Sequence, residues 1–188
     1  MTEDEGKRLI NMSARRVEFI PLAVKTIVVH TVTYFVMGLL ALTLLNYGSW
    51  FAESDLSSFM RQIDDPLVMS GPLFQPIRGL LFAVVFYLLR DVLFGRKNGW
   101  MVMWVLLVVI GVLSTFGPSP GSIEGMIYTI LPFWEHLRGW PEVVVQALAF
   151  SSILTYWVQH PEKRWLTRTL AAAFVLVLLL PAMGLLFT

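Results

Sequence analysis

The chain has 188 residues, of which 56% are hydrophobic and 14% are charged, and its mean hydropathy is +0.69. Soluble domains carry about a quarter charged residues, so this composition argues against a water-soluble globule and for a membrane protein. Fourteen basic and thirteen acidic side chains leave a net charge of +1, which gives no support for binding to nucleic acid. Because the sequence contains no cysteine, it excludes disulfides, thiolate metal sites and cysteine nucleophiles.

Five apolar segments follow one another along the chain, and each is a candidate membrane span. A helix needs about 20 mostly apolar residues to cross about 30 Å of hydrocarbon. The second and fourth segments are short for this purpose and need basic flanks that snorkel or a locally thinned bilayer. The sequence therefore predicts an all-α integral membrane protein with a basic N-terminal segment, 1–26, and a membrane domain, 27–188. The predicted spans are residues 27–45, 76–93, 100–116, 143–158 and 169–187.

The basic residues are unevenly distributed among the connections between these spans. Eleven of the fourteen fall on the side of the N-terminal segment, and only Arg61, Arg78 and Arg138 fall on the other side. Because basic loops stay in the cytoplasm, we expect a multi-pass protein of the cell membrane with a cytoplasmic N-terminus and an external C-terminus. Tryptophans near both ends of the spans agree with this topology, since aromatic side chains favour the two membrane interfaces. The outer loops are then residues 46–75 and 117–142.

Two eight-residue stretches, 72–79 and 132–139, resemble each other. Both have Pro in the first position, Arg in the seventh and Gly in the eighth, with apolar residues at matching positions between them. An inward span, a basic turn and an outward span follow each stretch. This order indicates a parallel internal repeat, with one N-terminal anchor helix beside two helical hairpins. The alternative is that Pro, Arg and aromatic residues recur wherever helices enter a membrane.

Polar residues in and near the two stretches are candidates for an outward-facing ligand pocket. If the stretches are repeats, Arg78 and Arg138 face each other across the pseudo-axis, at a depth where polar groups need partners or water. The alternative is that both arginines snorkel to lipid phosphates. The candidate ligand-binding residues are Gln75, Arg78, Glu124, Glu135, His136 and Arg138.

Two further features lie inside the predicted spans. His30 is an intramembrane polar residue, which is either a functional group or a histidine bonded to a neighbouring carbonyl or hydroxyl. Ala147, Ser151 and Thr155 follow one another at intervals of four residues. Small residues at this spacing predict a face for close helix packing, either within the chain or between copies.

The chain carries no pattern that establishes catalysis or metal binding. Residues 117–121 match G-x-S-x-G, but Pro120 follows the serine and has no N–H for an oxyanion hole. The three histidines fall at different depths of the predicted topology, so they cannot share one metal ion. We therefore expect no catalytic residue, no metal and no cofactor.

Three functions remain compatible with these observations. The first is a non-catalytic polytopic membrane protein that acts through helix–helix assembly, as a homo-oligomer or with a membrane partner protein. The second is a small solute or anion transporter or channel that uses the outward-facing polar pocket. The third is a lipid-modifying enzyme that uses Glu124, Glu135 and His136 as acid–base groups. In each case the partner is a lipid bilayer and not a nucleic acid.

Overall fold

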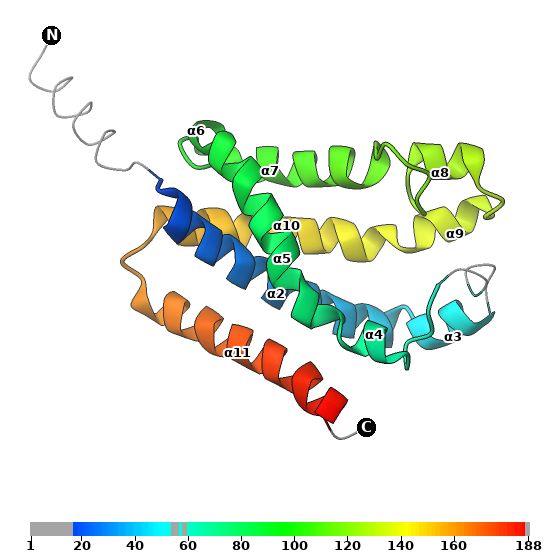
Figure 1. Cartoon of the computed structure of the whole chain (residues 1–188). Coiled ribbons are helices and arrows are strands. Elements are labelled where there is room, and N and C mark those ends of the chain that lie inside the picture. Colours follow the sequence, from blue (N-terminus) through cyan, green and yellow to red (C-terminus); the bar gives the residue numbers. More distant parts are fainter. Residues whose placement is uncertain (1–16, 54–56, 58–59, 187–188) are drawn as a thin grey trace, which may run out of the picture.

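A computed structural model describes residues 17–53, 57 and 60–186, and this part of the chain is helical with no strand. The longer helices run back and forth between the two ends of an elongated bundle (Figure 1). These helices are α2 (Phe19–Leu44), α5 (Gly71–Leu88), α7 (Gly99–Val108) with its π-helical continuation η2 (Val109–Leu113), α10 (Trp140–Gln159) and α11 (Arg164–Leu186). The short helices are α3 (Tyr47–Glu53), α4 (Pro66–Met69), α6 (Arg90–Leu93), α8 (Ile123–Tyr128) and α9 (Phe133–Arg138).

Four helical segments in the described residues are long and apolar enough to cross a bilayer. They are Phe19–Leu44, Gly71–Leu88, Phe133–Gln159 and Arg164–Gly184. Because helices satisfy their own backbone hydrogen bonds in lipid, these segments indicate a multi-pass membrane protein that is helical in the part of the chain the structure describes. The predicted span 100–116 is a shorter apolar helix, Gly99–Leu113. At 1.5 Å per residue it is about 22 Å long.

Several helix boundaries differ from those predicted. The first helix begins at Phe19, so the later part of the predicted N-terminal segment is helical, while residues 1–16 lie outside the described residues. The last helix begins at Arg164, not at residue 169, and α5 ends at Leu88, not at residue 93. The predicted outer loops contain four short helices and the first residues of α5 and α10.

Proline explains why two of the spans begin earlier than predicted. Pro72 lies in the first turn of α5, and Pro141 lies in the first turn of α10. At that position the missing N–H has no intrahelical partner to lose, so proline starts a helix and does not break it. As a result the predicted short span 143–158 is a helix of 20 residues.

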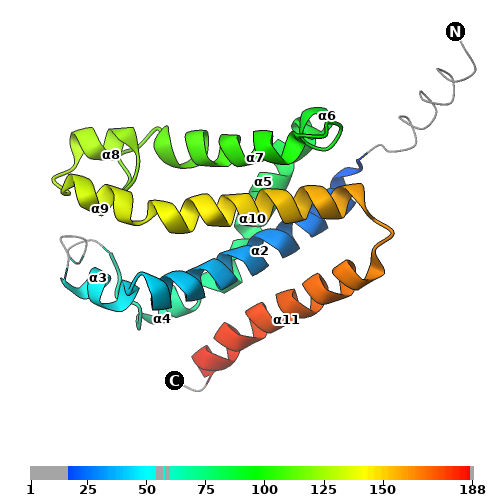
Figure 2. The same cartoon turned by 180° about the vertical axis from the view of Figure 1, so that it is seen from behind.

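Helix α2 lies at the centre of the bundle, as the view from behind also shows (Figure 2). It packs against α5, α10 and α11, whereas α7 packs against α10. Eight of its residues between Leu22 and Thr33 are buried, and they point to every side of the helix. The layout of one anchor helix beside two hairpins is not confirmed by this arrangement and stays a prediction, as does the repeat itself.

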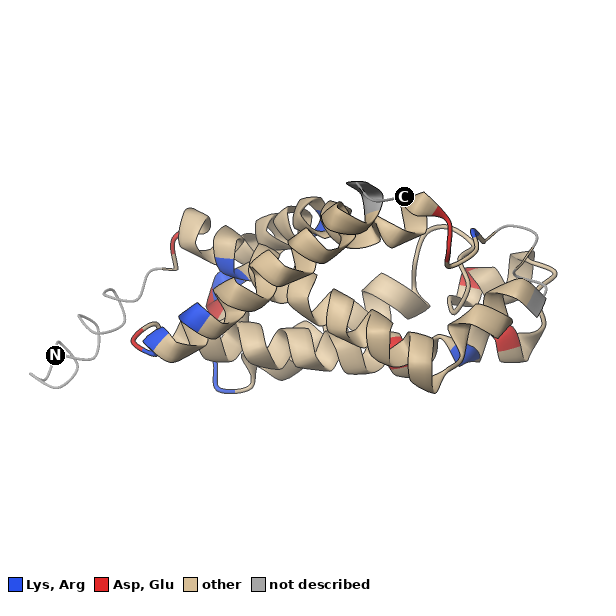
Figure 3. Cartoon of the chain, turned by 90° about the horizontal axis from the view of Figure 1, so that it is seen from below, with Lys and Arg blue, Asp and Glu red and all other residues tan. Residues whose placement is uncertain are grey.

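Most charged residues lie toward the two ends of the bundle (Figure 3). We call one end, formed by the start of α2, α6 and the α10–α11 connection, the basic end. We call the opposite end, formed by α3, α4, α8 and α9, the acidic end. The described part of α2 begins at the basic end and α11 finishes at the acidic end. The basic end carries Lys25, Arg90, Arg96, Lys97, Lys163, Arg164 and Arg168.

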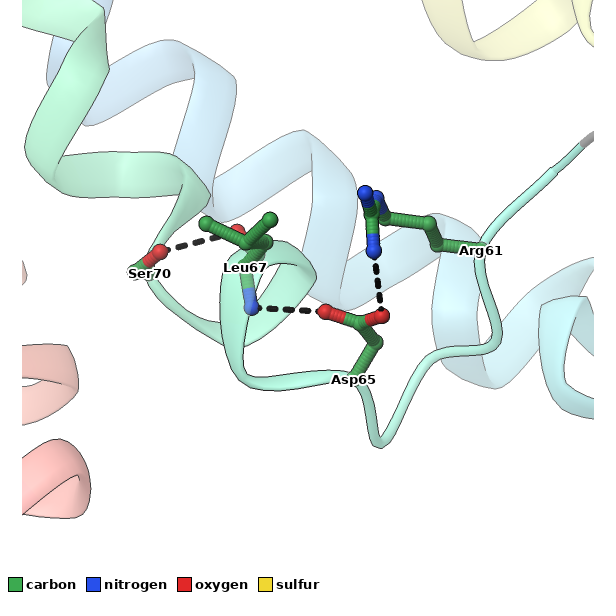
Figure 4. Close-up of polar contacts among 4 residues, drawn as sticks. All are labelled: Arg61, Asp65, Leu67 and Ser70. Carbon is green, nitrogen blue, oxygen red and sulfur yellow. Dashed lines mark hydrogen bonds and ion pairs between the residues drawn. The ribbon is translucent and has the colours of Figure 1, made fainter.

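At the acidic end, Asp65 caps the N-terminus of α4, the short helix that precedes α5 (Figure 4). The carboxylate of Asp65 accepts a hydrogen bond from Arg61 at 2.9 Å and another from the backbone N–H of Leu67 at 2.8 Å. These two bonds hold the pKa of Asp65 below its ordinary value. The hydroxyl of Ser70 donates to the carbonyl of Leu67 at 2.9 Å. The cap therefore fixes α4 immediately before α5 begins.

Candidate functional site

His30 forms a hydrogen-bonded pair with Gln75 between α2 and α5. The His30 side chain is buried, with the residue 2% exposed, and its Nε2 lies 3.1 Å from Oε1 of Gln75. The amide nitrogen of Gln75 donates to the carbonyl of Gly71 at 3.2 Å. Gln75 therefore presents its oxygen to the ring, and His30 must donate from Nε2–H. Its Nδ1 is then a buried acceptor that has no partner among the described residues.

Aromatic rings from three helices surround this histidine. The ring of Phe82 meets it edge-on with centroids 5.0 Å apart, and the centroids of Phe150 and Tyr34 lie 5.3 and 6.3 Å away. The guanidinium of Arg78 lies 5.6 Å from the centroid of Phe82 and acts electrostatically on His30. The polar pair is thus enclosed by apolar surface, with one cation nearby.

A second group of polar contacts joins α3 to α9 and α10 at the acidic end. The hydroxyl of Tyr47 donates to the carboxylate of Glu142, and the indole N–H of Trp50 donates to Glu135. The guanidinium of Arg138 lies 4.9 Å from the centroid of the buried Trp50. Burial and the bond to Glu142 raise the pKa of Tyr47 above its ordinary value. These contacts dock α3 onto α9 and the start of α10.

His136 holds the connection between α7 and α9. Its buried Nδ1 accepts from the backbone N–H of Gly121 at 3.1 Å, and its Nε2 lies 3.4 Å from the hydroxyl of Thr129. The indole N–H of Trp140 donates to the carbonyl of Gly121 at 3.0 Å. Gly121 has a φ of +88°, a conformation that favours glycine. The contacts of His136 therefore order the loop between η2 and α9.

The structure distributes the six candidate ligand-binding residues over separate contacts. Gln75 is paired with His30, Glu135 and Arg138 both contact Trp50, and His136 contacts the loop. Arg78 lies over Phe82, and Glu124 lies in the first turn of α8. None of these contacts, among the described residues, gathers all six into one group. Tyr47 and Trp50, which bond to Glu142 and Glu135, were not among the predicted site residues.

The row of small residues on α10 is buried within the chain. Ala147, Ser151 and Thr155 are all buried, and α10 packs against α2 and α7. The hydroxyl of Ser151 donates to the carbonyl of Ala147 at 2.7 Å. The hydroxyls of Thr31 and Thr155 are buried with no hydrogen-bond partner in the described part of the chain. A contact between copies has to use other faces than this row.

Neither a metal-binding group nor a known relative points to a function for this arrangement. No group of three His, Asp or Glu side chains in residues 17–53, 57 and 60–186 could hold a metal ion. No protein-family model, curated protein or solved structure matches the chain. The fold and the polar contacts define a multi-pass helical membrane protein whose function must be inferred from its own residues.

Proposed function

We propose that the chain is a non-catalytic protein of the cell membrane that acts by assembling with a second copy of itself through α7 and η2. The observation that supports this proposal most is the length of the apolar helix Gly99–Leu113. Its length of about 22 Å falls short of the roughly 30 Å of hydrocarbon that a span must cross. A span that is too short is accommodated by a thinned bilayer, by snorkelling flanks or by oligomerisation.

The outer face of this helix favours oligomerisation among these three. Met101, Val105 and Val109 recur at intervals of four residues and are 42%, 47% and 44% exposed. The opposite face of the helix, including the buried Met103, packs on the core, and α10 is its main neighbour. A second copy placed against this stripe would cover it with protein and would let both short helices share one thinned region of bilayer.

The number of membrane crossings and the side of the membrane on which each terminus lies are part of the same proposal. If α7 and η2 cross together with the four longer spans, the chain crosses the membrane five times and its ends lie on opposite sides. The distribution of charge supports placing the basic end, and with it the N-terminus, in the cytoplasm. The C-terminus is then outside.

Disulfide crosslinking tests the assembly, because the chain has no cysteine of its own. We expect Val105→Cys, oxidised in the native membrane, to form a disulfide-linked dimer. Leu176→Cys, on an exposed face of α11, is the matched control and should stay a monomer. A Val105→Cys protein that crosslinks no more than the control, together with a single-chain mass in mild detergent, would contradict the proposal.

One observation favours a second function, the transport of a small solute or anion. Buried polar groups inside a membrane often mark a solute pathway, and His30 has an unpartnered Nδ1 beside Gln75 and Arg78. The pathway would begin at the acidic end. The third candidate, a lipid-modifying enzyme, has less support, because Glu135 and His136 are already bonded to Trp50 and to the loop.

Flux measurements in liposomes distinguish transport from assembly alone. If the chain transports an anion, Arg78→Ala and Arg138→Ala should lower its flux, because Arg138 is a cation of the acidic end and Arg78 lies farther along α5, over Phe82 beside His30. Arg61→Ala should leave the flux unchanged, since Arg61 is engaged with Asp65 on the surface. Flux that is absent in the wild type, or equal in all three variants, would exclude this function for the solute tested.

A further inference from the structure

Three cations at the basic end each contact an aromatic ring and an uncharged oxygen, which is a backbone carbonyl for two of them and a hydroxyl for the third. The ammonium of Lys25 donates to the carbonyl of Trp157 at 3.0 Å and lies 5.4 Å from the centroid of its ring. The guanidinium of Arg90 donates to the carbonyl of Tyr87 at 2.9 Å and lies 4.5 Å from its ring. Trp157 and Tyr87 both lie in the last turn of a helix, where carbonyls are left without an N–H from a following turn and accept other donors.

The third cation, Lys163, lies at the start of the connection to α11. Its ammonium donates to the hydroxyl of Tyr156 and lies 5.0 Å from the centroid of that ring. The bond to Tyr156 raises the pKa of Lys163 above its ordinary value, so its positive charge is retained. The three cations thus belong to the start of α2, to α6 and to the α10–α11 connection. Figure 1 shows these elements at one end of the bundle.

Among the described residues, the basic side chains of this end outnumber the acidic ones. Its seven described basic residues accompany three acidic ones, namely Glu18, Asp91 and Glu162. Among the described residues, a salt bridge between a basic side chain and a carboxylate forms at the acidic end, between Arg61 and Asp65, and none forms at the basic end. The carbonyls, the Tyr156 hydroxyl and the rings fix Lys25, Arg90 and Lys163 in place, but they carry no formal charge. The excess of positive charge at this end therefore favours an anionic partner.

We propose that the basic end is a binding surface for the phosphate groups of anionic phospholipids, with Lys25, Arg90 and Lys163 as its main contacts. An ammonium has three N–H donors and a guanidinium has five, so each cation keeps donors for phosphate oxygens beyond the contact it already makes. Exposed Trp100 and Trp165 begin α7 and α11 at this end. Tryptophan favours the headgroup level of a bilayer, so these residues place the three cations at the depth of lipid phosphates.

This inference does not depend on the proposed dimer, because it concerns a different surface. Inorganic phosphate and a lipid headgroup share the same recognition chemistry, so the experiment must separate them. The purified full chain is titrated in mixed micelles with phosphatidylglycerol, with phosphatidylcholine or with inorganic phosphate, and binding is measured by the rise in melting temperature. We expect phosphatidylglycerol to raise it, and phosphatidylcholine and phosphate alone to have little effect.

Variants then assign the binding to these residues. Each of Lys25→Gln, Arg90→Gln and Lys163→Gln should weaken phosphatidylglycerol binding about fivefold, the effect expected for one charge near an anionic surface. Arg61→Gln, at the opposite end, is the matched control and should bind as the wild type does. If the loss of a carbonyl contact prevents a variant from folding, Arg168→Gln, an exposed residue of the same end, provides the measurement.

Three results would overturn the proposal. The first is equal stabilisation by phosphatidylcholine and phosphatidylglycerol, which would show that the headgroup charge is not recognised. The second is stabilisation by inorganic phosphate alone to the same extent, which would assign the site to a soluble anion. The third is a loss of binding in Arg61→Gln as large as in the basic-end variants, which would show that only the total charge matters.

Discussion

Replacing Gly79 with alanine should destabilise the protein by about 1–3 kcal/mol, the range for overpacking a close contact. A Cβ at this position would lie 2.7 Å from the Cα of Ile27. The atom it meets belongs to the backbone of the central helix, which cannot rotate away as the tip of a side chain can. We therefore expect α5 to be pushed off α2. Because α2 and α5 share the His30–Gln75 pair, this displacement should also strain their hydrogen bond.

Gly38→Ala in α2 is the matched control. A Cβ at Gly38 has no neighbouring atom within 4 Å, although Gly38 also lies inside a helix. There the better helix propensity of alanine should make the change neutral or stabilising, by up to about 1 kcal/mol. The free energy of unfolding in mixed micelles measures both effects. Equal stabilities for the two variants would show that α2 and α5 do not approach as closely as the structure has them.

The sequence predicted the helical class and most of the spans because the thickness of a bilayer sets a length that apolar segments must meet. It did not predict the helix starts at Gly71 and Trp140, because proline ends helices in most contexts and begins them only in the first turn. It also could not place α2 at the centre. A membrane helix is apolar toward lipid and toward protein alike, so hydropathy does not separate buried faces from exposed ones.

The candidate site was predictable only in part. The sequence identified His30 and Gln75 as polar residues that need partners, yet it assigned Gln75 to an outer pocket and expected a backbone or hydroxyl partner for His30. Their contact joins residues 45 positions apart, and it depends on how α2 and α5 are rotated about their axes. The contact between Trp50 and Glu135 depends in the same way on the docking of α3, which no local pattern specifies.

Gln75→Leu should destabilise the bundle by about 1–3 kcal/mol, because it leaves both ring nitrogens of His30 buried without a partner. His30→Phe should have an effect of similar size, since it leaves the amide oxygen of Gln75 unpaired. The double variant removes both polar groups at once. A phenyl ring also fits the surroundings of His30, where Phe82 and Phe150 already pack. We therefore expect the double variant to be more stable than either single variant.

The free energies of unfolding of the wild type, both single variants and the double variant form a cycle that measures the pair directly. A coupling of about 0.6–1.7 kcal/mol is the range for hydrogen bonds between membrane helices. Single-variant losses that simply add in the double variant would show that the two side chains do not interact. The double variant also distinguishes a structural role of the His30–Gln75 pair from a role in transport. If the pair only holds α2 to α5, any flux survives its removal, whereas a pathway through His30 is lost although the bundle remains folded.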